Sequence, residues 1–297
     1  MELRHLRYFT AAAEALSFSR AAEKLHVSQP ALSRQIADLE DELGVELFKR
    51  ERQRVTLSGG GRFFLPLARR ILCDAETSVQ QLREAHGDGE RVLRIGFIST
   101  FADDFVAPAV RQLRKLHPRL KVSLFDLPPR AQLDRLRAHE LDAALLGNLD
   151  ERDRADFRVV RLGQYPMAAV VPADDALAAR RSISVGDLRT RDFISLSDSA
   201  FPGRRDFLRG ICQPHGFEPR ITLEADSLQL LLAAVAAGEG VALLPRHAEK
   251  LPHSGCQFVA LKKPVPQAEA YLLRSSEENS LAKEFEQIVA KGIVYGG

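Results

Sequence analysis

The sequence predicts an α+β protein of several domains, in which a group of short helices precedes one long helix and a larger α/β region. Apolar residues recur at helical spacing in short segments up to Gly44, and again without interruption from Phe63 to Leu82. After Arg91, strand-like apolar runs alternate with helical segments. A chain of 297 residues is long enough for two domains. We therefore expect a first domain over 1–58, a linker and dimerisation helix within 59–91, and a C-terminal domain over 92–297.

Charge and composition indicate an ordinary globular protein. The net charge is only +2, and the first 91 residues contain equal numbers of basic and acidic side chains. Only Lys49–Arg54 is strongly basic, so any electrostatic contact with DNA must be local. The charged N-terminus has no apolar signal-peptide core, and no apolar run approaches the length of a membrane span. We expect a cytoplasmic protein with no membrane partner.

The first domain is predicted to contain three short helices and a basic hairpin. Helical spacing runs from Leu3 to Leu16 and again from about Phe18 to Leu25. A third helix begins after Ser28, a suitable N-cap, with Pro30 in its first turn and Gly44 at its end. Short apolar runs on both sides of the basic segment are typical of two strands around a wing.

The second and third helices have the pattern of a helix-turn-helix. The positions expected to pack across a tight turn are Ala21, Ala22, Leu25, Val27, Leu32 and Ile36. Polar residues at the start of the third helix then face outward, where hydroxyls and forked donors are suited to phosphates and base edges. The candidate DNA-binding residues of this helix are Ser28, Gln29, Pro30, Ser33 and Arg34. Helix spacing alone leaves open a purely structural three-helix domain.

The long helix is predicted to dimerise. Its narrow apolar seam consists of Phe64, Leu67, Ile71, Ala75, Ser78 and Leu82. No other apolar segment nearby is available to cover this seam, although a helix packed on its own domain is the alternative. The glycines at 59–61 are expected to loosen the joint before the helix, and His86–Gly89 reads as a hinge.

The C-terminal region is predicted to form two α/β lobes with mostly parallel sheets. The expected strands are 92–98, 121–127, 141–147, 167–171, 193–196, 241–244, 258–261 and 270–273, and the expected helices are 105–117, 131–139, 204–215, 227–237 and 281–290. Open α/β sheets bind ligands beyond the carboxyl ends of their strands. The candidate ligand-binding residues at such ends are Ser99, Thr100, Phe101, Asn148, Ser197, Phe201 and Ser227. The hydroxyls among them are equally suited to be simple helix caps.

The segment from Ala21 to Arg50 closely resembles the N-terminal signature of the LysR family of bacterial transcription regulators. The matching residues are Ala21-Ala22-x-x-Leu25-x-Val27-Ser28-Gln29-Pro30-Ala31-Leu32-Ser33-x-Gln35-Ile36-x-x-Leu39-Glu40-x-x-Leu43-Gly44-x-x-Leu47-Phe48-x-Arg50. The resemblance implies a winged helix-turn-helix whose third helix enters the major groove of a double-stranded, partly palindromic operator. It also implies that Arg50, Arg52 and Arg54 of the wing contact the DNA backbone or minor groove.

The rest of the chain resembles the same family more weakly, through Leu93–Phe97 and Val235–Pro245. The family's architecture implies a periplasmic-binding-protein-like domain with lobes of about 92–163 plus 266–297 and about 164–265, and a small-molecule inducer in the cleft. It further implies a homodimer doubled to a tetramer, and contact with RNA polymerase. Within the family, the stretches Val235–Gly240 and His215–Pro219 resemble the benzoate- and muconate-responsive branch, which points to an aromatic or other small organic acid. Asn148 and Pro129 depart from that branch, where an arginine and a hydroxyl are expected, and a lost arginine weakens carboxylate binding.

Other classes of protein fit the sequence less well. An enzyme is not expected, because no catalytic or dinucleotide-binding motif occurs in its required context. No cofactor or metal is expected either, since Cys73, Cys212 and Cys256 have no zinc spacing. A thiol-based redox sensor that pairs Cys212 with Cys256 remains the alternative on the same scaffold. A periplasmic solute-binding protein is disfavoured by the DNA-reading segment and the missing signal peptide.

Overall fold

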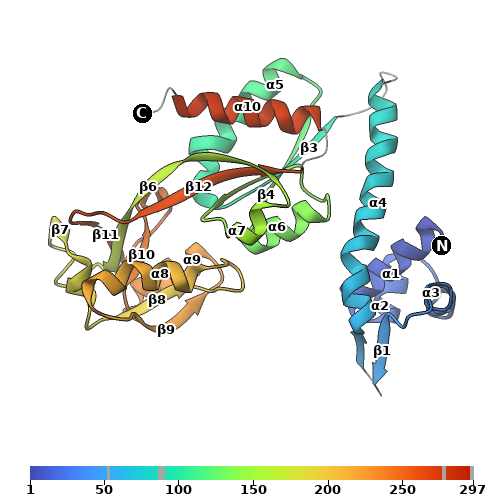
Figure 1. Ribbon diagram of the computed structural model, residues 1–297, viewed down its shortest axis with the longest axis horizontal. Helices are drawn as coiled ribbons and strands as arrows, with labels where there is room; N and C mark the ends of the chain where they lie inside the picture. Colours follow the sequence, from blue (N-terminus) through green and yellow to red (C-terminus); the bar gives the residue numbers. More distant parts are fainter. Residues whose placement is uncertain (52–53, 86–90, 276–278, 295–297) are drawn as a thin grey trace. The chain divides into compact units, whose positions relative to one another are not determined.

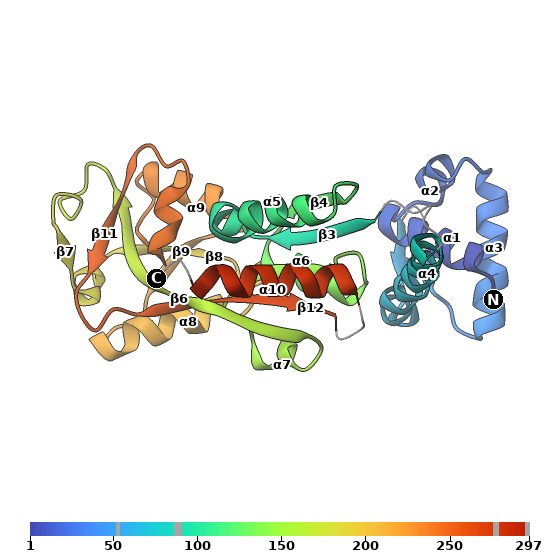
Figure 2. The same cartoon turned by 90° about the horizontal axis from the view of Figure 1, so that it is seen from above.

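The computed structural model describes residues 1–51, 54–85, 91–275 and 279–294. The chain forms two compact units: Met1–Arg91 with the short segment Arg137–Glu140, and the remaining residues from Val92 onward. Within the described ranges, no helix is both long and apolar enough to span a membrane. The two units are shown in Figures 1 and 2. We call the first the DNA-binding head and the second the effector domain, after the roles that the family resemblance implies.

The DNA-binding head has the expected helices and hairpin. Its elements are α1 (Leu3–Ala15), α2 (Phe18–Lys24), α3 (Gln29–Leu43), β1 (Phe48–Glu51), β2 (Arg54–Leu57) and α4 (Gly59–Ala85). The two strands pair antiparallel, from Phe48 opposite Leu57 to Glu51 opposite Arg54. The predicted winged helix-turn-helix is therefore confirmed, and the predicted hinge at 86–89 lies outside the described residues.

An aromatic cluster joins the elements of the head. Phe9 of α1 contacts Phe48 of β1 and Phe64 of α4, with ring centroids 5.6 and 5.4 Å apart, and Phe18 of α2 also packs on Phe48 at 5.2 Å. The assignment of Phe64 to the outward seam of the long helix was thus wrong. Phe64 belongs to the core of the head, and Phe63 is the exposed residue at that end of the helix.

Two of the three glycines that open the long helix, Gly60 and Gly61, serve close packing, which corrects the expectation of a loose joint. A Cβ at Gly61 would lie 2.0 Å from the carbonyl oxygen of Leu47, and one at Gly60 would lie 2.4 Å from Cγ1 of Val45. Ser58 caps α4, since its Oγ accepts a hydrogen bond from the Gly61 N–H at 2.9 Å. The start of α4 is therefore held tightly against the segment that precedes the wing.

The first lobe of the effector domain is a sheet covered by helices on both faces. Its parallel strands are β3 (Val92–Phe97), β4 (Lys121–Asp126) and β5 (Ala143–Gly147). Alternate residues of β5 face opposite cores, and this continuous apolar run is typical of a strand buried on both sides. One face is covered by α5 (Ala107–Leu116) and α10 (Ser280–Val294), which lie side by side (Figure 2), and the other by α6 (Pro129–Arg137).

Two long strands, β6 (Arg158–Pro172) and β12 (Gln267–Arg274), run from the first lobe toward the second (Figure 1). They pair with each other antiparallel, from Arg158 opposite Arg274 to Pro166 opposite Gln267. Beyond this stretch β6 pairs antiparallel with strands of the second lobe. The sheet is therefore mixed, and the expectation of mostly parallel sheets was wrong, because the crossing strands run against their neighbours.

The second lobe is built around the end of β6. Its other strands are β7 (Ser182–Ile183), β8 (Asp192–Leu196), β9 (Arg220–Ala225), β10 (Ala242–Pro245) and β11 (Cys256–Leu261). Helix α8 (Arg204–Cys212) contributes to the core on one face, and α9 (Leu228–Ala236) to the core on the other. Strand β9, the first half of β6 and the short helix α7 (Glu151–Arg154) were not predicted from the sequence, although the apolar-polar alternation of Ile221 to Ala225 would have indicated β9.

Candidate nucleic-acid interface and effector pocket

The turn between α2 and α3 is fixed by local backbone contacts. His26 has a positive φ of 55°, which reverses the chain after α2. The N–H of Val27 donates to the carbonyl oxygen of Ala22 at 3.0 Å, and the N–H of Ala31 donates to Oγ of Ser28 at 3.4 Å. The capped start of α3 is thereby placed next to the end of α2.

Helix α3 presents a polar face opposite a buried one. Leu32, Ile36 and Leu39 are fully buried against α1 and α2. Among the predicted DNA-binding residues of this helix, four are exposed and Ser33 is half-buried; the exposed ones are Ser28, Gln29, Pro30 and Arg34. The exposed first turn of a helix offers N–H groups and side-chain donors to a phosphate or a base edge.

The end of α3 also positions the wing. Oε1 of Glu40 accepts hydrogen bonds from the N–H groups of Leu47 and Phe48, at 2.6 and 3.0 Å. Arg50 lies in β1 and Arg54 in β2, whereas Arg52 falls outside the described residues. The two strand arginines therefore flank the tip of the hairpin.

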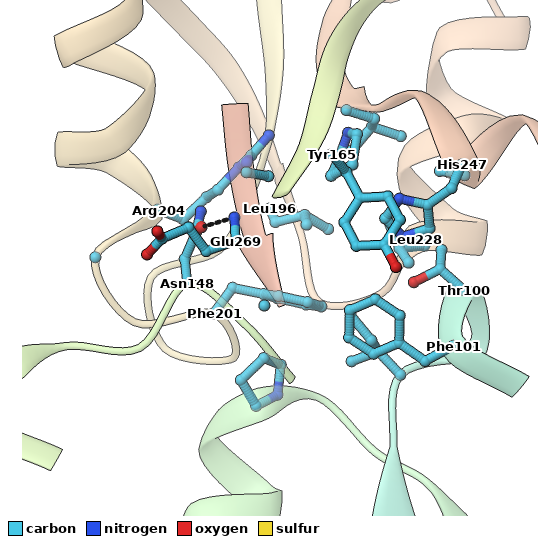
Figure 3. A pocket seen from close by; sticks show the side chains of 18 of the residues that line it. Thr100, Phe101, Asn148, Tyr165, Leu196, Phe201, Arg204, Leu228, His247 and Glu269 are labelled. Atoms are coloured by element: carbon cyan, nitrogen blue, oxygen red, sulfur yellow. Dashed lines mark hydrogen bonds between the residues drawn. The ribbon is translucent and has the colours of Figure 1, made fainter. Parts of the chain in front are cut away.

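A cavity of about 70 Å³ lies between the two lobes of the effector domain. Figure 3 shows residues that line it, which come from the ends of β3, β5, β8 and β10, from the crossing strands and from the start of α8 and α9. This volume holds about five to seven water-sized groups, which is enough for a small organic molecule. The cavity lies in the cleft predicted from the sequence.

Four of the predicted ligand-binding residues line this cavity: Thr100, Phe101, Asn148 and Phe201. Asn148 also has a structural role, because its Oδ1 accepts from the N–H of Glu269 at 3.0 Å and its own N–H donates to the Glu269 carbonyl at 3.1 Å. These bonds join the end of β5 to β12. Pro129, the other departure from the family branch, lines the cavity as well.

The other three predicted residues do not line the cavity, and each has a local partner. Oγ of Ser227 caps α9 through the N–H of Leu230 at 3.2 Å, and Oγ of Ser197 bonds to Oδ1 of Asp226 at 2.5 Å. Oγ of Ser99 accepts from Nε2 of Gln229 in the second lobe at 3.4 Å. These serines therefore lie outside the lining of this cavity, and their hydroxyls serve as caps and interlobe contacts.

Four polar residues of the cavity were not predicted from the sequence: Tyr165, Arg204, His247 and Glu269. Tyr165 lies on β6, Arg204 begins α8, and His247 follows β10 in a short 3-10 helix. A clue for Arg204 was its place at a predicted helix start after Phe201. Nothing local to Tyr165 or His247 distinguishes them from surface residues, because their neighbours are distant in sequence.

Burial sets the charge of the cavity. Burial lowers the pKa of His247 to about 4, although the negative charge of Asp104 acts to raise it. The imidazole is therefore neutral near pH 7. Burial, reinforced by the Asp104 carboxylate, raises the pKa of Tyr165 to about 12, and burial lowers the pKa of Arg204 to about 10. Arg204 thus remains a cation, while Tyr165 and His247 are uncharged.

Two family models together match almost the whole chain. Residues 3–62 match the bacterial regulatory helix-turn-helix protein of the lysR family, and residues 86–292 match the LysR substrate binding domain. The chain belongs to the LysR family. It is a transcription regulator with a DNA-binding helix-turn-helix and an effector-binding domain, and not an enzyme.

AlsR, BenM and CbnR, three members of the LysR family, match this chain over nearly their full lengths. The HTH-type transcriptional regulator AlsR of Bacillus subtilis is 31% identical over 290 residues, which cover 97% of this chain and 95% of AlsR. BenM of Acinetobacter baylyi is 30% identical over 299 residues, which cover 100% of this chain and 98% of BenM. The crystal structure of the LysR family regulator CbnR has a TM-score of 0.76 and 25% identity, and the match covers 99% of both chains.

Proposed function

We propose that this regulator reads a partly palindromic operator with α3 and the wing, and that a small organic molecule in the interlobe cleft controls it. The observation that carries the first part is the exposed polar start of α3 above a fully buried face. A structure of the similar CbnR in complex with its target DNA matches this chain with a TM-score of 0.73. The residues assigned to DNA are Ser28, Gln29, Pro30, Ser33, Arg34, Arg50, Arg52 and Arg54.

Dimerisation through α4 gives the symmetry that a palindromic operator requires. Large apolar side chains along α4 are exposed in the single chain: Phe63, Leu67, Ile71, Val79 and Leu82. They recur at helical spacing, so a second copy of the helix buries them. The effector domains then double the dimer to a tetramer through the edge strand β4 and α5, where Leu124 and Leu116 are exposed.

Ligand binding acts through closure of the two lobes. Three contacts join the lobes beside the cavity: Lys250 Nζ to Asp104 Oδ1 at 2.5 Å, the Arg130 N–H to the Ala200 carbonyl at 3.0 Å, and Gln229 to Ser99. A ligand that prefers one degree of closure shifts the population of the two arrangements. The changed placement of the heads alters DNA bending and the contact with RNA polymerase, in the cytoplasm where the operator lies.

A titration with DNA tests the proposal. Fluorescence anisotropy of the upstream intergenic duplex is measured against the purified full-length chain at several salt concentrations, with a scrambled duplex as control. We expect tight, sequence-selective binding with a steep salt dependence, because phosphate contacts release counterions. Equal affinity for both duplexes would contradict operator recognition by α3.

The redox alternative is not favoured by the structure. Cys212 belongs to the core on one face of the second lobe's sheet, and Cys256 belongs to the core on the other face. Both thiols are buried and free, and burial raises both pKa values, to about 12 for Cys212. A buried thiol held in its protonated form is a poor nucleophile toward peroxide. The sheet between the two sulfur atoms separates the proposed pair.

A further inference from the structure

Polar groups at the cavity lack hydrogen-bond partners within the described part of the chain. They are Nε of Arg204, Oγ1 of Thr100 and both ring nitrogens of His247. Buried donors and acceptors are nearly always paired in folded proteins, because an unpaired one loses its hydration without compensation. Several such atoms around one cavity indicate that a bound molecule supplies their partners when the lobes adjust around it.

Arg204 marks one end of the cavity as a site for a negative charge. The residue is 7% exposed, and it begins α8 after Gly203, whose position as N-cap provides no side-chain acceptor. One guanidinium nitrogen donates to the carbonyl of Leu243, which orients the group without neutralising it. No acidic neighbour among the described residues opposes the effect of burial on its pKa. A carboxylate from the ligand both pairs with this guanidinium and restores its lost solvation.

The opposite end of the cavity is polar and uncharged. Figure 3 shows Thr100, Tyr165 and His247 grouped together, on the other side of Leu196 and Phe201 from Arg204. The His247 ring stacks on Phe101, with ring centroids 5.5 Å apart, and packs at a tilt of 55° against Tyr165, with centroids 4.2 Å apart. A hydroxyl, a neutral imidazole and a phenol offer both donors and acceptors to a neutral group.

Negative charges near the cavity disfavour a second carboxylate on the ligand. The Asp104 carboxylate acts on both Tyr165 and His247, and its ion pair with Lys250 leaves no uncompensated positive charge among the described residues at this end to bind a second carboxylate. Glu269 also lines the cavity, and its pKa is lowered by its hydrogen bond with Tyr271 and by Arg161, so it is ionised. Arg204 is therefore the one cation among the described lining residues that lacks an acidic partner.

We infer that the cleft selects a small monocarboxylate that carries a hydroxyl, or a similar uncharged polar group, at the end remote from its carboxylate. The carboxylate pairs with Arg204, the apolar middle packs on Leu196, Phe201 and Leu228, and the hydroxyl bonds to Thr100 and His247. This assignment rests on the proposed sensing function of the cleft. Arg204 binds the carboxylate in place of the arginine that the family branch is expected to carry where this chain has Asn148.

Calorimetric titration of the full-length protein with two matched series of probes tests the ligand class. The aromatic series is 4-hydroxybenzoate, benzoate, terephthalate and phenol, and the aliphatic series is 4-hydroxybutyrate, butyrate and succinate. In the series that fits the cavity, we expect the hydroxy acid to bind about 3- to 10-fold tighter than its parent acid. The dicarboxylate and phenol are expected to bind at least about tenfold more weakly than the hydroxy acid.

Variants assign the two ends of the ligand. Arg204→Met is expected to lower the affinity for the acids by about tenfold or more. The matched control is Arg205→Met, because Arg205 is exposed, pairs with Glu224 and does not line the cavity. Thr100→Val and His247→Phe leave Arg204 and its bond to Leu243 in place. We expect them to remove the advantage of the hydroxy acid over its parent acid.

The outcomes separate this inference from the proposed function. Preference for a dicarboxylate or phenol, unchanged acid affinity in Arg204→Met, or no binding by any acid would overturn the ligand class. DNA binding measured by anisotropy on the same preparation reports independently on the regulator function. Selective DNA binding without acid binding therefore contradicts only the ligand assignment, whereas absent operator selectivity contradicts the proposed function.

Discussion

Replacing Gly61 by alanine is expected to destabilise the DNA-binding head strongly. The new Cβ would lie 2.0 Å from the carbonyl oxygen of Leu47 and 2.9 Å from Cδ2 of Leu57. Contacts this short do not persist, so α4 must move away from the segment before the wing by about 1 Å, in a tightly packed region. The movement also disturbs the 2.9 Å hydrogen bond from the Gly61 N–H to Ser58.

The expected size follows from three contributions. Overpacking costs about 1–3 kcal/mol, and the weakened hydrogen bond costs about 1 kcal/mol. Alanine returns about 0.5–1 kcal/mol through its higher helix propensity. The net loss is about 2 kcal/mol, which lowers the melting temperature of a domain of this size by roughly 8–16 °C.

The neighbouring glycines provide matched controls. A Cβ at Gly59 meets no atom within 4 Å, so Gly59→Ala is expected to stabilise the head by about 0.5–1 kcal/mol. A Cβ at Gly60 would clash mainly with the side chain of Val45, which is 49% exposed and can move, so Gly60→Ala is expected to cost less than Gly61→Ala. Calorimetry of the full-length variants ranks their stabilities, and hydrogen exchange of the α1 amides shows that the change lies in the head. If Gly61→Ala proves as stable as Gly59→Ala, the close packing at this joint is refuted.

Three further substitutions test the two sites. Arg34→Ala is expected to cost about 1–3 kcal/mol in operator discrimination with folding and ligand binding intact, and anisotropy with operator and scrambled duplexes would show an unchanged ratio if Arg34 does not read the operator. Thr100→Val is expected to weaken the inducer response without changing DNA affinity in the absence of inducer; an undiminished response in a reporter assay would remove Thr100 from the site. His247 binds a proton in the unfolded chain below pH 6.5 but in the folded chain only below about pH 4, so stability is complete above pH 6.5 and falls as the pH is lowered toward 4. The loss of stability at pH 5 should be smaller by about 2 kcal/mol in His247→Phe. Urea midpoints are compared at pH 7 and pH 5, and an equal shift in the unchanged protein and in His247→Phe would contradict the assignment.

Short-range patterns accounted for most of the secondary structure. Ser28, Pro30 and Gly44 marked the ends of α3 where the structure has them, because caps and breakers act through their immediate neighbours. The crossing strand β6 was predicted only over its buried second half. Its first half, Arg158–Pro166, is largely exposed or half-buried, and it forms a strand because β12 pairs with it.

The candidate ligand site was predictable in location but only partly in composition. The sequence pattern placed Thr100 and Asn148 directly after strands, and the carboxyl ends of these strands meet at the cleft. Ser197 and Ser227 follow the same rule, yet their hydroxyls bond to Asp226 and to the N–H of Leu230. The sequence cannot distinguish a capping hydroxyl from a ligand-binding one, because both occur at the same positions relative to strands and helices.

By itself, the sequence determined the winged helix-turn-helix, the long helix and the two-lobed α/β domain, since each depends on periodicity and on caps within a few residues. The tertiary structure alone decided which side chains meet. It turned Phe64 inward and left Phe63 exposed, it placed Cys212 and Cys256 on opposite faces of a sheet, and it brought Arg204 and His247 to one cavity with Thr100. The physical reason is that burial and the resulting charge state of these groups come from residues far apart in the chain, which only the completed packing brings together.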